Sequence, residues 1–168
     1  MEQMSIAAVD IGGTKIACGL VSIGEAGGAT PVVSAVEKIP TEAAQDGEHV
    51  LARVISTVQA ALERAEGPVA GVGISSAGVV DPRTGDITFA NELMPGWGGT
   101  KLAAAVSEAC GLPCRVLNDV HAHALGEARW GDGRKASSCL VVAVGTGIGG
   151  AITHPTSLTS WFKAEVEK

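Results

Sequence analysis

Short apolar runs separated by turns dominate the start of the chain. Ser5–Asp10 is almost continuously apolar, which predicts a strand buried on both faces. A turn at Ile11–Thr14 separates it from a second predicted strand, Ile16–Ile23. A glycine-rich loop over 24–30 leads to a third, Pro31–Ile39. Three strands joined by short connections predict a meander.

Helices and strands alternate after the meander. Residues 46–65 repeat apolar positions at the helical period, and Gly67-Pro68 ends the pattern, so a long helix is expected. A buried strand at Val69–Ser75 and strong turn chemistry at Asp81–Asp86 follow. The remaining expected elements are a helix capped by Thr100, running to Cys110 and closed by Gly111, a strand at Cys114–Leu117, and a helix from Asn118 or Asp119 to Trp130. The predicted order is βββαβαβα, an α/β fold.

The strand-and-turn pattern restarts after residues 131–135. Cys139–Val144 is a buried apolar run, and a glycine turn at Gly145–Gly150 follows it. This repeats the arrangement of Ile6–Val9 and the glycine turn after it, which indicates a weak internal repeat. Two such units are what a clamp around one nucleotide between two related domains would require.

Composition narrows the classes of partner. The 168 residues are 46% hydrophobic and 18% charged, which is typical of a compact globular protein. The net charge is −6 and no run of Lys or Arg occurs, so we expect no nucleic-acid partner. An acidic protein must hold an anionic ligand with backbone N–H groups and a metal ion. With no signal peptide and no apolar stretch long enough to span a bilayer, we expect a soluble cytoplasmic protein without a membrane partner.

The cysteines do not predict a zinc site. Cys110 and Cys114 are spaced as C-x₃-C, but no second Cys or His pair matches them. His121 and His123 would lie on different faces of a helix. We therefore expect ordinary, mostly buried thiols at all four cysteines.

The first glycine turn, Asp10-Ile11-Gly12-Gly13-Thr14-Lys15, could bind phosphate. Glycines after a buried strand let the backbone approach a ligand, and successive N–H groups can cradle phosphate oxygens. Asp10 could position Mg²⁺ directly or through water. The alternative is a plain hairpin in which Gly12 and Gly13 supply positive φ. The motif is not a Walker A loop, because the Gly-x₄-Gly-Lys-Ser/Thr spacing is missing.

The second glycine turn formally matches a dinucleotide-binding fingerprint. Gly145, Gly147 and Gly150 satisfy G-x-G-x-x-G after a strand. That fold needs a helix starting at the turn, which Pro155 disfavours, and too little chain follows for a βαβ unit. A phosphate-binding hairpin is the interpretation that remains.

Asn118-Asp119 lies where a strand is expected to end and a helix to begin. Both residue types are favoured helix caps, so a structural role is the simpler interpretation. Ligands nevertheless bind at the carboxyl ends of parallel strands, and a carboxylate there could accept the proton of a sugar hydroxyl. Asn91 is most simply a turn former and Trp97 a core residue.

Together these motifs resemble the ROK family of bacterial sugar kinases and sugar-responsive repressors, which includes glucokinases and N-acetylmannosamine kinases. The resemblance extends from about Ile6 to Ile152. Five stretches carry it, in this order: Val9–Lys15, Gly73–Asp81, Asn91–Trp97, Leu117–Glu127 and Val144–Gly150. It implies a ribonuclease-H-like domain of the actin, heat-shock ATPase and hexokinase superfamily.

The resemblance also implies a function, the ATP-dependent phosphorylation of a hexose, and a role for each matching residue. The ATP phosphates would be held by Gly12, Gly13, Thr14 and Lys15 of the first turn and by Gly145, Thr146, Gly147 and Gly149 of the second. The sugar would be contacted by Asn91, Asn118, Asp119 and the backbone near Gly78. Asp119 would be the general base, and Asp10 would lie near Mg²⁺.

The chain departs from the family pattern at its end. We expect residues 1–135 to form an N-terminal actin-like ATPase domain and 136–168 the truncated start of a second domain with an atypical tail. We therefore expect the isolated chain to lack kinase activity, to contain no zinc motif and to form a homo-oligomer through an unpaired strand edge. A non-catalytic sugar-sensing module and an inactive remnant of the family remain alternatives. The sugar itself is not predicted.

Overall fold

The computed structural model describes residues 4–22, 30–144 and 148–153. The chain forms two compact units, Met1–Asn118 and Asp119–Lys168. Each unit is described by itself below. The domain boundary expected after residue 135 stays a prediction.

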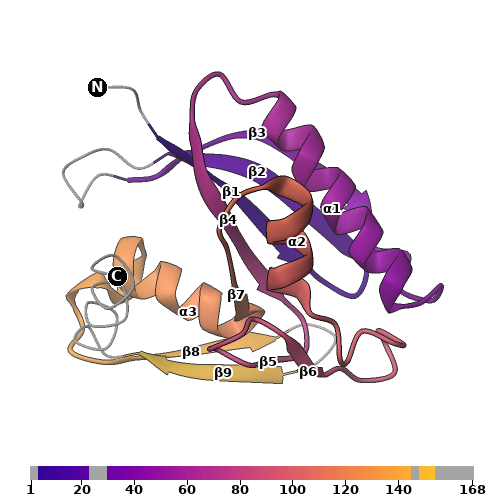
Figure 1. The fold of residues 1–168 in the computed structure, drawn as a ribbon. Coiled ribbons are helices and arrows are strands. Elements are labelled where there is room, and N and C mark those ends of the chain that lie inside the picture. The colour runs from indigo at the N-terminus through magenta and orange to yellow at the C-terminus, as the bar shows by residue number, and fades with distance from the viewer. Residues whose placement is uncertain (1–3, 23–29, 145–147, 154–168) are drawn as a thin grey trace. The chain divides into compact units, whose positions relative to one another are not determined.

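The first unit is built on a five-stranded mixed sheet in the order β3-β2-β1-β4-β7 (Figure 1). The strands are β1 (Ser5–Ile11), β2 (Lys15–Ser22), β3 (Val32–Pro40), β4 (Val69–Ser76) and β7 (Cys114–Asn118). Antiparallel pairing joins β1 to β2 and β2 to β3, which confirms the predicted meander. Parallel pairing joins β1 to β4 and β4 to β7, so these three strands end at the same edge.

Two helices, α1 (Gly47–Glu63) and α2 (Leu102–Cys110), pack on the sheet of this unit (Figure 1). α1 begins where the sequence predicts, because the Asp46 carboxylate accepts the His49 N–H at 2.7 Å. The left-handed Gly111, with φ 67°, closes α2 as expected. The predicted Thr100 cap is wrong. The N–H of Thr100 donates to Trp97 and its carbonyl accepts from Ile87, which holds it in the preceding loop and leaves Lys101 as the uncapped helix start.

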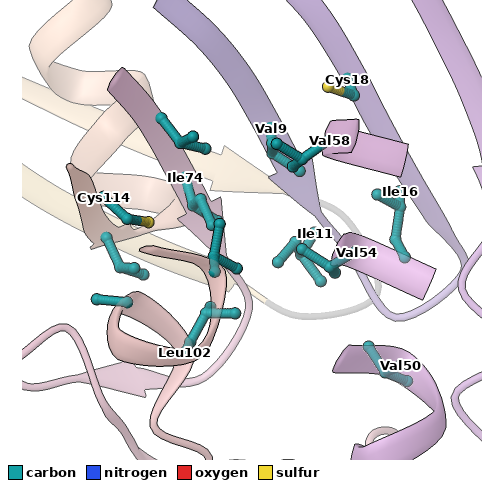
Figure 2. Close-up of a cluster of buried hydrophobic side chains, with 14 of the residues drawn as sticks. Val9, Ile11, Ile16, Cys18, Val50, Val54, Val58, Ile74, Leu102 and Cys114 are labelled. Carbon is teal, nitrogen blue, oxygen red and sulfur yellow. The ribbon is translucent and has the colours of Figure 1, made fainter. Parts of the chain in front are cut away.

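One face of the sheet forms the hydrophobic core with these helices. Val9 and Ile11 of β1 lie against Val54 and Val58 of α1 in Figure 2, and all four are buried. Fully burying each such side chain contributes roughly 1.5–3 kcal/mol. Because strand side chains alternate, Asp10 between them belongs to the opposite face and is exposed.

The segment between β4 and α2 contains two short strands that the sequence did not predict. They are β5 (Val79–Val80) and β6 (Ile87–Phe89), which pair antiparallel. The turn expected between them is confirmed, since the Gly85 N–H donates to the Asp81 carbonyl at 2.8 Å. Trp97 is fully buried, as expected, and its indole N–H donates to Ser76 Oγ at 3.2 Å. The long excursion is thereby fastened to the end of β4.

The second unit is a helix on a hairpin. It comprises α3 (Asp119–Trp130), the 3₁₀ helix η1 (Asp132–Lys135), β8 (Cys139–Val144) and β9 (Ile148–Thr153). The two strands pair antiparallel, which confirms the hairpin predicted around the second glycine turn, and α3 packs against both. No helix among the described residues is long and apolar enough to cross a membrane.

Candidate functional site

The first glycine turn connects β1 to β2 and presents an exposed backbone. Gly13, Thr14 and Lys15 are all exposed. The Gly12 N–H donates to the Lys15 carbonyl at 2.9 Å and is therefore used within the turn. In the parts of the chain that the structure describes, the N–H groups of Gly13 and Thr14 donate to no protein acceptor. Two adjacent N–H groups are thus open to an anion.

The conformation of the turn contradicts the plain-hairpin interpretation of its glycines. Neither Gly12 nor Gly13 has φ in the left-handed region, so positive φ is not why glycine occurs there. A Cβ atom at Gly13 would meet no atom within 4 Å, and one at Gly12 would lie an acceptable 3.4 Å from the Lys15 oxygen. Internal packing therefore does not require these glycines. What they do provide is unhindered approach to the backbone from outside.

Asp10 is paired with a serine on the neighbouring parallel strand. Asp10 of β1 lies opposite Ser75 of β4, and Ser75 Oγ donates to Asp10 Oδ1 at 2.6 Å. The hydroxyl donor orients the carboxylate while the rest of the group stays accessible. The sequence did not single out Ser75. Only the parallel register of β1 and β4, which pairs the last residue but one of each strand, brings Ser75 next to Asp10.

Gly78 and Asn118, both predicted sugar contacts, are bonded to each other. Asn118 Nδ2 donates to the Gly78 carbonyl at 2.8 Å. Gly78 has φ 100°, and a Cβ atom there would lie 2.7 Å from the Phe89 carbonyl oxygen. Glycine is therefore required by the fold at this position. The Asn118 amide thereby ties the end of β7 to the start of the excursion.

Asn91 is exposed in the loop after β6. Its Oδ1 accepts the Leu93 N–H at 3.1 Å, and its carbonyl accepts the Met94 N–H at 3.0 Å. These bonds confirm a turn-forming role. They do not use the side-chain NH₂ group of Asn91, which is an exposed residue.

Asp119 is the first residue of α3 and is half-buried. Its Oδ1 accepts the Val120 N–H at 2.9 Å, which satisfies one of the unpaired donors at the helix start. One carboxylate oxygen thus has a structural contact, as the capping interpretation expected.

The second glycine turn falls largely outside the described residues. Gly145, Thr146 and Gly147 lie there, whereas Gly149 is described. A Cβ atom at Gly149 would lie 2.8 Å from Val120 Cγ2, so close packing of β9 on α3 accounts for this glycine. Its predicted phosphate contact stays a prediction.

Cys18 and Cys114 are buried thiols. Burial raises the pKa of the Cys18 thiol to about 11 and that of Cys114 to about 12. Such thiols are protonated near neutral pH and are poor nucleophiles and metal ligands. All four cysteines are free, and the described residues contain no group of three or more potential metal ligands.

A mixed sheet with a β1–β2–β3 meander followed by parallel β4 and β7 defines the class of protein: the ribonuclease-H-like fold of the actin and hexokinase superfamily. A solved structure supports this assignment, the ROK family glucokinase from Streptomyces griseus in complex with glucose and AMPPNP. It is 33% identical, with a TM-score of 0.75, over 89% of this chain and 44% of that one.

Sequence comparison gives the family. The ROK family model matches residues 6–160, so the chain belongs to the ROK family. The glucokinase of Streptomyces coelicolor is 35% identical over 86% of this chain and 42% of its own length. A beta-glucoside kinase of Listeria innocua is 33% identical over 89% of this chain and 46% of its length. The chain therefore spans about half the length of these relatives.

Proposed function

We propose that this chain supplies the ATP-phosphate turn and the catalytic carboxylate of an ATP-dependent hexose kinase. The observation that supports the proposal most is the Gly12–Lys15 turn. It carries two open N–H groups and two glycines that neither conformation nor packing requires. A turn of this kind can bind phosphate oxygens. The second support comes from the relatives, which are named as kinases of glucose and of beta-glucosides.

Asp10 suits a supporting role toward Mg²⁺. Its carboxylate is exposed and oriented by Ser75, and hard oxygen ligands are what Mg²⁺ prefers. Mg²⁺ that binds with a nucleotide is usually held by one or two carboxylates, the phosphates and water. When bound with the nucleotide, Mg²⁺ would neutralise phosphate charge.

Asp119 is proposed as the general base. Its carboxylate would accept the proton of the sugar hydroxyl as that oxygen forms a bond to the γ-phosphorus and the bond to ADP breaks. The Val120 N–H on Oδ1 supports the role, because it orients the carboxylate. Asn118 and Asn91 are proposed sugar contacts, from family membership. The phosphate contacts of Gly145, Thr146, Gly147 and Gly149 are proposed from family membership alone.

Isothermal titration separates this function from its alternatives. The purified chain is titrated with Mg·ATP, glucose and N-acetylmannosamine. We expect saturable binding of Mg·ATP and of at least one sugar. Binding of sugar without nucleotide would instead identify a sensing module, and binding of neither would identify an inactive remnant.

A further inference from the structure

Thr41 lies directly beneath the glycine turn, although it is far from it in the sequence. It follows the last residue of β3 and is fully buried. Its Oγ1 donates to the Gly12 carbonyl at 2.6 Å, and its N–H donates to the Thr14 carbonyl at 3.1 Å. One residue thus holds two of the carbonyl groups of the turn.

A hydrogen bond that fixes a carbonyl group also fixes the direction of the N–H group in the same peptide. In a trans peptide, the carbonyl of one residue and the N–H of the next point in opposite directions. No peptide bond among the described residues is cis. The Thr41 hydroxyl on the Gly12 carbonyl therefore turns the Gly13 N–H away from the protein. That N–H is one of the two that remain open to an anion.

The position of Thr41 is itself held by the residue after it. Glu42 has φ 57°, a left-handed conformation that costs a non-glycine residue of the order of 1–3 kcal/mol. The Glu42 carboxylate Oε2 is contacted by Gln45 Nε2 at 3.3 Å, His49 Nε2 at 2.9 Å and Arg53 Nη1 at 3.3 Å. These contacts stabilise the sharp bend that brings Thr41 under the turn.

We propose that Thr41 is a positioning residue for nucleotide binding, which orients the Gly12–Gly13 peptide so that the Gly13 N–H meets a phosphate oxygen. This inference rests on the proposed function and extends it. It assigns to a buried side chain, one that would not touch the nucleotide, control over the shape of the phosphate turn. An immobilised peptide dipole binds an anion more tightly, because less ordering is needed when the ligand arrives.

Three variants of the chain test the proposal. Thr41→Val removes the hydroxyl but keeps the shape and the backbone N–H, and Thr41→Ser keeps the hydroxyl. Thr57→Val is the matched control, because Thr57 is also buried in this unit and donates to a backbone carbonyl, that of Arg53, at 2.7 Å. Affinity for Mg·ATP is measured by isothermal titration. The order of the Gly13 amide is measured without ligand from its ¹⁵N heteronuclear NOE.

We expect Thr41→Val to weaken Mg·ATP binding about tenfold, with sugar affinity unchanged, and to lower the Gly13 NOE. Thr41→Ser should restore both, and Thr57→Val should change neither. An equal loss of affinity in Thr41→Val and Thr57→Val would overturn the proposal, as would an unchanged Gly13 NOE in Thr41→Val. If the unmodified chain does not bind Mg·ATP, the proposed function fails, and the ligand-free NOE still decides whether Thr41 orders the turn.

Discussion

The Ser75 hydroxyl donates a 2.6 Å hydrogen bond to the Asp10 carboxylate, and the two residues occupy matching positions on parallel strands β4 and β1. The bond lies on the sheet face opposite the core formed with α1 and α2, next to the glycine turn that follows β1. It gives the carboxylate one fixed partner and leaves it exposed. Ser75, to which the sequence analysis assigned no role, thus orients Asp10, which it placed near Mg²⁺.

Ser75→Ala should therefore weaken Mg·ATP binding while preserving the fold. Loss of a hydrogen bond to a charged group at a partly exposed site predicts a decrease in affinity of about threefold to tenfold. Isothermal titration measures it, with Asp10→Asn as the more severe variant. Ser56→Ala is the matched control, because Ser56 is exposed and bonds only within α1. Equal affinities in Ser75→Ala and the control would show that the bond has no role in binding.

Two glycine substitutions should affect different properties, one the affinity for Mg·ATP and the other the stability of the fold. A Cβ atom at Gly13 occupies open space, so Gly13→Ala should change the free energy of unfolding by less than about 1 kcal/mol while reducing Mg·ATP affinity. Gly78→Ala places a Cβ atom 2.7 Å from the Phe89 oxygen at φ 100°, so it should destabilise the chain by roughly 1–3 kcal/mol or more. Urea unfolding and isothermal titration test both. Nucleotide binding that survives Gly13→Ala unchanged would contradict the phosphate role.

Asp119→Asn should remove most of the turnover without disturbing the helix start. Asparagine keeps an oxygen that can accept the Val120 N–H, so only the basicity is lost. General-base assistance is worth about 10²–10⁴-fold in rate. A coupled ADP-release assay, in a preparation that phosphorylates sugar, should show a decrease of that order with sugar affinity retained. Asp132→Asn, an exposed acid of the same unit, is the control. Near-normal turnover in Asp119→Asn would show that Asp119 is not the general base.

Self-association of the purified chain should depend on the β8–β9 hairpin. One face of it is more than half-exposed and apolar, with side chains Leu140, Val142, Val144, Ile148 and Ile152. In a solution of this chain alone, a second copy is the available apolar partner. Light scattering after size-exclusion chromatography should show oligomers that Val142→Lys dissociates. Val32→Lys, at a comparably exposed valine of β3, should leave them intact. If Val32→Lys dissociates the oligomers and Val142→Lys does not, the chains associate through β3 and the prediction is wrong.

Periodicity predicted the strands and helices that bury one face, but not what joins them. β1, β4 and α1 carry long apolar patterns, so their positions could be predicted within a few residues. β5 and β6 have two and three residues, too few for alternation to show. The bonds from Thr41 to Gly12 and from Ser75 to Asp10 depend on strand register, which tertiary packing sets. The motifs therefore drew attention to the glycine turn, and the structure identified Thr41 and Ser75 as residues that contact the turn and Asp10.

The most direct test of the account is an NMR titration of the ¹⁵N-labelled chain, first with Mg·AMPPNP and then with glucose. We predict that the nucleotide shifts the backbone amides of Gly13 and Thr14, whose N–H groups are open in the turn. We predict that the sugar shifts the side-chain amides of Asn91 and Asn118. Saturable shifts confined to these residues and their neighbours would support a sugar kinase site. An unchanged spectrum at Gly13 and Thr14, at nucleotide concentrations that saturate other amides, would contradict it.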